Sequence, residues 1–201
     1  MTPEPESTPT SSTNLILASG SPRRRDLLAQ IGLDDVQVVA PEVDETPVGD
    51  ELPRQMAARL ADTKAAVVAA RYPGRFVLAA DTVVAKGRRA LGKAETEVIA
   101  RRCLKLLSGG RHRVYSAITV VAPDGTTRHR MATTVVGFKR LSGDDITTYL
   151  ASEEWSGKAG GYAIQGRAAM FVRSLNGSYS GVVGLPLHET ASLLYGLGMR
   201  W

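Results

Sequence analysis

Two acidic residues stand apart from the others in this 201-residue sequence. Asp81 follows the apolar run 76–80, and Glu45 lies in an acidic loop bounded by Pro41 and Pro47. An acid that ends an apolar strand occupies the place where open α/β sheets carry their chemistry. Two carboxylates from separate segments would suit Mg²⁺, which takes oxygen ligands and often shares them with substrate phosphates. By spacing alone, a turn-capping Asp81 and a surface Glu45 are equally good interpretations.

The segment 15–28, LILASGSPRRRDLL, has the pattern of a phosphate site. An apolar run breaks at small residues and resumes as a helix, which predicts a strand, a tight turn and a helix beginning at proline. The hydroxyls of Ser19 and Ser21, the helix N-terminus and the guanidinium groups of Arg23 and Arg24 would together suit an anion. Helix neighbours point about 100° apart, so at least one of the three consecutive arginines faces solvent. Ordinary helix capping followed by a basic turn is the alternative.

Three lysines and one glutamine are further candidates for ligand contacts. Lys64 lies within the apolar stripe of a helical pattern, which is unusual for a free lysine. Lys93 and Lys158 each lie next to glycine, where the backbone leaves room for a ligand. The amide of Gln165 offers both a donor and an acceptor to the edge of a base. Taken singly, each of these residues is better explained by surface solvation.

Composition and missing motifs narrow the classes of function. The three histidines are scattered, and the single cysteine, Cys103, excludes an intrachain disulfide and a cysteine-based zinc site. The sequence has neither a P-loop nor a serine-hydrolase elbow. A net charge of +5 favours anionic partners, but aromatics make up only 5% and the basic residues are dispersed, so a small phosphorylated ligand is at least as good a candidate as nucleic acid. No apolar run reaches the ~20 residues of a membrane span and no signal-peptide core is present, so we expect a cytoplasmic protein with no membrane partner.

The elements that must position these residues mix strands with helices. We expect one domain over residues 14–201, after a disordered tail at residues 1–13 that is rich in Pro, Ser, Thr and Glu. The class is α/β or α+β, because an antiparallel pair of strands interrupts the alternation. The expected elements are a strand at 15–18, helices at 22–31 and 53–72, a strand at 76–80, a turn at 86–88, a helix at 95–107, strands at 115–122 and 127–139, a helix ending at 150, a glycine-rich loop at 153–166, short strands at 171–175 and 179–183, and a helix at 186–197.

Eight motifs in this order resemble the Maf family of nucleoside triphosphate pyrophosphatases, also known as septum formation inhibitor proteins. The resemblance runs from about Leu15 to about Leu197 and omits only the tail. Each motif alone is weak, but eight in order are highly specific. They are SGSPRRRDLL, VDET, RLADTKA, LAADTVV, LGKAET, LLSGGRHRVYSAITV, GKAGGYAIQGRAAMFV and NGSYSGVVGLPLHET.

The resemblance implies a mixed α/β fold of two lobes, akin to inosine triphosphate pyrophosphatases, with an elongated central sheet and a cleft between the lobes. It implies hydrolysis of a nucleotide at the α–β linkage, to a nucleoside monophosphate and pyrophosphate, with Mg²⁺ or Mn²⁺. It also leaves a homodimer open and gives no reason to expect a nucleic-acid partner. The older family name keeps a second possibility: a nucleotide-binding regulator of cell division with little turnover.

The family's functional positions can be matched one by one. Asp81 matches the proposed proton acceptor, and with Glu45 it would hold the metal. The phosphate-facing positions are matched by Ser19, Arg23, Arg24, Lys64, Lys93 and Lys158.

Three positions separate the family's subgroups. Arginine after Ser-Pro, threonine after the catalytic aspartate and glutamine before a late glycine mark a subgroup that resembles dTTP/UTP pyrophosphatases. Here these are Arg23, Thr82 and Gln165. A second subgroup handles 7-methyl-GTP and tends to have an aromatic residue in place of that arginine. All three markers therefore favour dTTP and UTP, with 7-methyl-GTP as the alternative.

Overall fold

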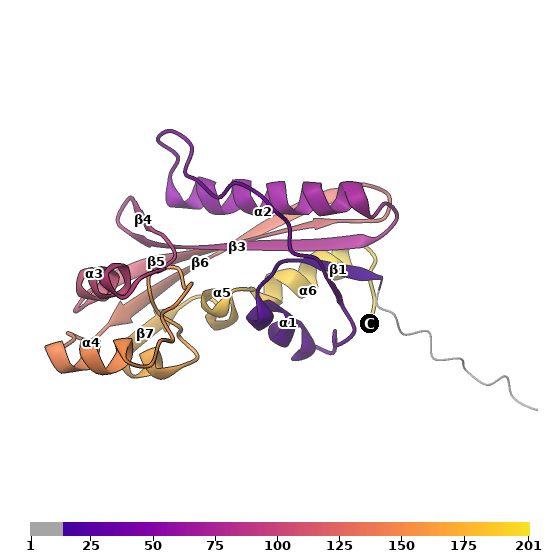
Figure 1. The fold of residues 1–201 in the computed structure, drawn as a ribbon. Helices are drawn as coiled ribbons and strands as arrows, with labels where there is room; N and C mark the ends of the chain where they lie inside the picture. The colour runs from indigo at the N-terminus through magenta and orange to yellow at the C-terminus, as the bar shows by residue number, and fades with distance from the viewer. Residues whose placement is uncertain (1–13) are drawn as a thin grey trace, which may run out of the picture.

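The computed structural model describes residues 14–201, and the expected tail at residues 1–13 lies outside them. Its centre is a seven-stranded mixed sheet with the order β2-β1-β3-β5-β6-β7, to which β4 adds beside β3 (Figure 1). The elements are β1 (Leu15–Ala18), α1 (Pro22–Ala29), β2 (Gln37–Val38), α2 (Pro53–Arg71), β3 (Phe76–Lys86), β4 (Arg89–Leu91), α3 (Glu97–Leu107), β5 (Arg111–Val121), β6 (Thr127–Phe138), α4 (Gly143–Leu150), the 3₁₀ helix η1 (Arg167–Phe171), β7 (Val172–Asn176), α5 (Tyr179–Val183) and α6 (Leu187–Gly196).

Three long antiparallel strands give the sheet its elongated form. β3 and β5 have 11 residues each and β6 has 12, and β5 pairs with β3 on one side and with β6 on the other. The short strand β1 joins β3 in parallel, as expected where a helix connects two strands. In Figure 1 the long strands run from one end of the molecule to the other, so the same strands form both ends of the sheet.

Helices cover both faces of the sheet and divide it into two lobes. In Figure 1, α2 lies along one face, while α1 and α6 lie against the other face near β1. One core cluster joins β1, α1 and α6 to β3 and β5, and includes Leu17, Leu28 and Leu194. Another surrounds α3, α4 and β7 at the far end, and includes Leu104 and Phe171. The expected two-lobed fold with an elongated mixed sheet is confirmed.

Most of the expected elements are present, with bounds shifted by a few residues. The strand, turn and helix at 15–29 occur as expected, with Pro22 in the first turn of α1. The hairpins at 86–89 and 121–127 also occur where turn residues predicted them. Cys103 is buried in the core cluster around α3. Across residues 14–201, no helix combines the length and the apolar character that crossing a membrane requires.

Two expectations from the sequence are wrong. The strand expected at 76–80 continues to Lys86, so Asp81 lies in the middle of β3 and not at its end. Pairing with β5 along residues 77–85 holds this part of the chain extended. Residues 179–183 form helix α5 and not a strand, because the side chain of Ser178 accepts a hydrogen bond from the N–H of Gly181 and caps the first turn.

Candidate active site

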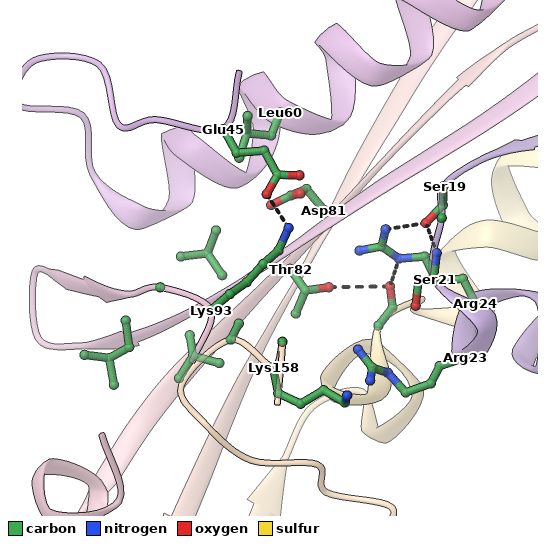
Figure 2. A pocket seen from close by; sticks show the side chains of 18 of the residues that line it. Ser19, Ser21, Arg23, Arg24, Glu45, Leu60, Asp81, Thr82, Lys93 and Lys158 are labelled. Carbon is green, nitrogen blue, oxygen red and sulfur yellow. Dashed lines mark hydrogen bonds and ion pairs between the residues drawn. The ribbon is translucent and has the colours of Figure 1, made fainter. Parts of the chain in front are cut away.

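A gap in the sheet leaves the middle of β3 without a paired strand along one edge. β1 pairs with β3 as far as Ala79, and β4 pairs with it only from Val84 onward. Residues 80–83 therefore have a neighbouring strand on one side only, which is β5. A cavity of about 790 Å³ opens at this gap, and the residues in Figure 2 line it. All the site residues expected from the sequence lie on its wall, namely Ser19, Ser21, Arg23, Arg24, Glu45, Lys64, Asp81, Thr82, Lys93, Lys158 and Gln165.

Asp81 points toward α2, where Lys64 meets it. Side chains alternate along a strand, so Asp81 shares the face of Ala79 and Val83, which is covered by α2. Lys64 Nζ lies 2.6 Å from Asp81 Oδ1, and both residues are only 7% exposed. A buried lysine and a buried aspartate in direct contact satisfy each other's charge. The polar interruption in the apolar stripe of α2 is thus explained by this ion pair.

Glu45 extends this pair into a chain of four charges. Lys64 Nζ also lies 2.7 Å from Glu45 Oε1, and Lys93 Nζ binds the other oxygen of Glu45. Burial raises the pKa of the Glu45 carboxyl, but hydrogen bonds from Lys64 and Lys93 outweigh it, so this pKa lies below its usual value. Glu45 is therefore an anion at neutral pH. Glu45 thus reaches into the site from the proline-bounded loop.

Thr82 faces the opposite side of the sheet, toward the loop between α5 and α6. Its hydroxyl lies 3.4 Å from the carbonyl oxygen of Gly184. Arg24 Nε donates to the same carbonyl at 2.8 Å, and Arg24 Nη1 donates to Ser19 Oγ at 2.8 Å (Figure 2). Burial lowers the pKa of the Arg24 guanidinium, while the charges of Asp81 and Glu45 act in the opposite direction. Arg24 thus ties α1 to the loop between α5 and α6 and brings a half-buried positive charge to the cavity.

The start of α1 leaves several polar groups free for a ligand. Ser21 is the N-cap residue, but its side chain makes no capping hydrogen bond. Arg23 makes no hydrogen bond or ion pair with any residue of the described chain, and its guanidinium lies beside Lys158 in Figure 2. Arg25 is exposed, so one of the three arginines does face solvent. Burial, above all, lowers the pKa of Lys158, and the charge of Arg23 lowers it further, against the opposing charge of Glu154.

The glycine-rich loop at residues 156–166 forms the opposite wall. Lys158 Nζ donates to the carbonyl of Ser156 at 2.8 Å. Gln165 is exposed at the cavity wall, and its side chain makes no hydrogen bond within residues 14–201. Both groups are therefore available to a bound molecule, and they come from different halves of the loop.

The two acidic residues fit a divalent cation only in part. Glu45 and Asp81 approach the same nitrogen, Lys64 Nζ, so their carboxylates face one another across a short distance. The described residues contain no group of three or more His, Cys, Asp or Glu side chains suited to a metal. Mg²⁺ commonly uses one or two carboxylates and completes its shell with waters and substrate phosphates. The donor set therefore suits a cation that a polyphosphate also ligates.

Two features of the site had no role in the sequence interpretation. The Gly184 carbonyl joins Thr82 to Arg24, and Gly184 has a φ of +148°, a conformation that favours glycine. His112 is buried behind the glycine-rich loop, with its Nε2 2.8 Å from the hydroxyl of Tyr162. The position of Gly184, just before Leu185-Pro186, was a signal for the role of its carbonyl. A histidine in an alternating strand pattern gave no signal for the second.

The comparisons with known proteins agree with this geometry. The model of the family described as Maf-like protein matches residues 14–197. The chain belongs to the Maf family. A Maf relative from Rhodospirillum rubrum, named dTTP/UTP pyrophosphatase, is 60% identical over 190 residues, covering 94% of this chain and 90% of the relative. Another of that name from Caulobacter vibrioides is 59% identical over 186 residues, covering 92% and 96%.

A solved structure supports the fold of this Maf protein independently of close sequence similarity. A HAM1 protein from Coxiella burnetii superposes with a TM-score of 0.50 and 17% identity, covering 90% of this chain and 98% of that one. At this identity the likeness concerns the fold alone. This likeness agrees with the expected inosine-triphosphate-pyrophosphatase type of fold.

Proposed function

We propose that this Maf protein hydrolyses nucleoside triphosphates at the α–β linkage, with dTTP and UTP favoured, to a nucleoside monophosphate and pyrophosphate. The observation that carries the proposal is the buried Asp81–Lys64 pair at the gap in the sheet, in a cavity lined by further cations. The names of the relatives from Rhodospirillum rubrum and Caulobacter vibrioides support the same reaction and the same nucleotides.

The triphosphate would lie among the free cations of the two walls. Arg23 and Lys158 have few or no partners of their own, so an anion would relieve their mutual repulsion. The hydroxyl of Ser21 and the main-chain N–H of Arg23 can donate hydrogen bonds to phosphate oxygens. Lys93 would exchange its contact with Glu45 for one with the phosphate chain. Neutralising the phosphate oxygens in this way makes the α-phosphorus accessible to a nucleophile.

Asp81 would act as the general base. Lys64 holds one carboxylate oxygen, and the other accepts no hydrogen bond from the residues that the structure describes. That free oxygen would take a proton from a water molecule as the water oxygen attacks the α-phosphorus. The bond from this phosphorus to the bridging oxygen then breaks, and pyrophosphate leaves with the bonding electrons. The proton ends on Asp81 and is released to solvent afterwards.

A divalent cation would complete the charge balance. We propose that Glu45 and Asp81 would hold Mg²⁺ or Mn²⁺ jointly with the phosphates. When bound, the cation neutralises charge on the phosphate oxygens and on the leaving pyrophosphate. Lys64 lies between the two carboxylates in their present arrangement, so it would shift toward the phosphates as the cation is bound.

Base selection would fall to Arg23, Thr82 and Gln165. The amide of Gln165 has no partner in the described chain and can pair with the polar edge of a pyrimidine. Thr82 and Arg23 border the same cavity. The expected cytoplasmic location remains a prediction from the sequence composition, and a homodimer remains a prediction from the family resemblance.

Pyrophosphate release from a panel of nucleotides tests this proposal. The panel is dTTP, UTP, CTP, GTP and 7-methyl-GTP, each with Mg²⁺ or Mn²⁺, assayed with the wild type and with Asp81→Asn. We expect dTTP and UTP to be preferred, and Asp81→Asn to lower turnover by about 10²–10⁴-fold. Circular dichroism should stay unchanged, which would show that the variant is folded.

Each other result has a definite meaning. Full turnover by a folded Asp81→Asn protein would show that another group is the base. A preference for 7-methyl-GTP would keep the reaction and refute the specificity argument from the three residues. Tight nucleotide binding with no release from any substrate would favour the regulator of cell division.

A further inference from the structure

The loop at residues 156–166 is held in its two halves by different means. Three main-chain hydrogen bonds of 2.9–3.1 Å join the first half to residues 92–94, next to Lys93. Lys158 belongs to this half, and an isolated β-bridge between Lys93 and Ala159 reinforces it. The position of Lys158 at the phosphate end is therefore set by backbone contacts alone.

The second half is held by two buried side chains, those of Tyr149 and His112. The N–H of Ala163 donates to the hydroxyl of Tyr149, on α4, at 3.0 Å. The hydroxyl of its neighbour Tyr162 lies 2.8 Å from Nε2 of His112, on β5. Two consecutive residues of the loop are thus each fixed by one buried polar contact. Gln165 lies two positions after Ala163, beyond the buried Ile164, at the cavity wall.

These two anchors have little freedom to move. Tyr149 is 1% exposed and His112 is 2% exposed, both in the far-end core. The rings of His112 and Tyr162 each pack edge-on against Phe138, with centroids 5.0 Å apart in both pairs. Burial raises the pKa of Tyr149 to about 12, so its hydroxyl stays neutral under ordinary conditions. Among the described residues, Nδ1 of His112 has no hydrogen-bond partner, so its contact with Tyr162 is the polar interaction that orients the ring.

We propose that Tyr149 and His112 are positioning residues that set the place of Gln165 and thereby the selection of the base. Neither residue is among the specificity positions inferred from the sequence, and neither lines the cavity. They act through Ala163 and Tyr162, both of which do line it. Loosening either anchor should disturb the base end of the site while leaving the phosphate end, with Lys158, in place. The inference rests on the proposed nucleotide hydrolysis.

The variant Tyr149→Phe tests the first anchor, since it removes one hydroxyl and keeps the ring. Without that oxygen the buried N–H of Ala163 has no acceptor. The equilibrium constant for the present conformation of the loop should therefore fall about tenfold. We expect KM for dTTP and UTP to rise about five- to tenfold, with kcat within about twofold of wild type. Inorganic tripolyphosphate, as a competitive inhibitor with no base, should keep its Ki. Hydrogen exchange at the amide of Ala163 should become faster.

Control variants make this test specific. Tyr179→Phe removes the hydroxyl of a tyrosine that is 51% exposed, and it should change none of these quantities. His112→Phe keeps an aromatic ring but removes the contact with Tyr162, and it should change KM and Ki in the same pattern as Tyr149→Phe.

Three results would overturn the proposal. They are an equal rise in KM for dTTP and Ki for tripolyphosphate, an unchanged KM with faster exchange at Ala163, or unchanged exchange in Tyr149→Phe. Failure of the proposed function is separate from all three, since it would appear as absence of turnover by the wild-type protein.

Discussion

The buried neutral imidazole of His112 makes the protein less stable in mild acid. Burial, and to a lesser degree the charge of Lys86, lowers the pKa of His112 to about 4, from an ordinary value near 6.5. The unfolded chain therefore takes up a proton between about pH 6.5 and pH 4, and the folded chain does not. Stability is complete above about pH 7 and falls with pH through this window. The whole difference amounts to about 3 kcal/mol, of which about 2 kcal/mol is lost between pH 7.5 and pH 5.

Equilibrium unfolding in urea at pH 7.5 and pH 5.0 measures this effect. His112→Asn cannot take up the proton, so its free energy of unfolding should change between the two pH values by about 2 kcal/mol less than that of the wild type. The comparison is a difference of differences, so any constant loss of stability in the variant cancels. His129 is exposed, and His129→Asn serves as the matched control that should leave the pH difference unchanged.

The refuting result is an equal pH difference in the wild type and in His112→Asn. It would mean that the folded state accommodates a protonated His112, and that the unpartnered Nδ1 finds an acceptor when it is charged. Glu45 would not affect the comparison, because its titration contributes equally to the wild type and to His112→Asn.

Three further predictions concern the cavity wall. Arg24→Ala should lower the free energy of unfolding by about 2 kcal/mol, because two buried acceptors lose their donor. Arg23→Ala should change it by less than about 0.5 kcal/mol and should instead weaken triphosphate binding. Equal losses of the two variants in urea unfolding would contradict this. Gly161→Ala should lower the free energy of unfolding by about 2–3 kcal/mol, since φ is +69° and the added carbon would lie 3.1 Å from the backbone of α3. Gly157→Ala, which adds its carbon in open space, should lower it by about 1 kcal/mol. Thermal unfolding would show the difference, and equal losses would exclude a contribution from the contact with α3. Lys64→Met should cost about 3–5 kcal/mol in urea unfolding because two carboxylates lose their shared cation, and a stable variant would mean that they are well solvated.

Local signals in the sequence predicted the framework of the site. The turn before α1 was predicted from small residues followed by Pro22, which favour a strand end and a helix start within a few positions. Lys64 was a candidate because a lysine in an apolar helical stripe needs a partner, and the partner proved to be Asp81. These features depend on residues close in the chain or on one unusual residue type, so they can be recognised without knowing the fold.

Features set by distant pairing could not be predicted. β3 continues past Asp81 because β5, more than 30 residues later in the chain, pairs with it. Residues 179–183 contain valine and tyrosine, which favour a strand. The cap from Ser178 makes them a helix, and the hydroxyl of Ser116, on β5, donates to the carbonyl of Gly181 at 2.6 Å. The roles of Gly184 and His112 likewise follow from contacts that only the tertiary fold creates.

The gap between β1 and β4 explains how neighbouring residues can serve different ends of one substrate. Asp81 and Thr82 are adjacent, so the alternation of a strand turns them to opposite faces of the sheet. A continuous sheet would separate these faces, but residues 80–83 lack a strand on one side, so a ligand at this edge can contact both. In the proposed reaction, the α-phosphate would meet Asp81 on the face of α2, while the rest of the substrate would lie against Thr82, Arg23 and Lys158 on the other face.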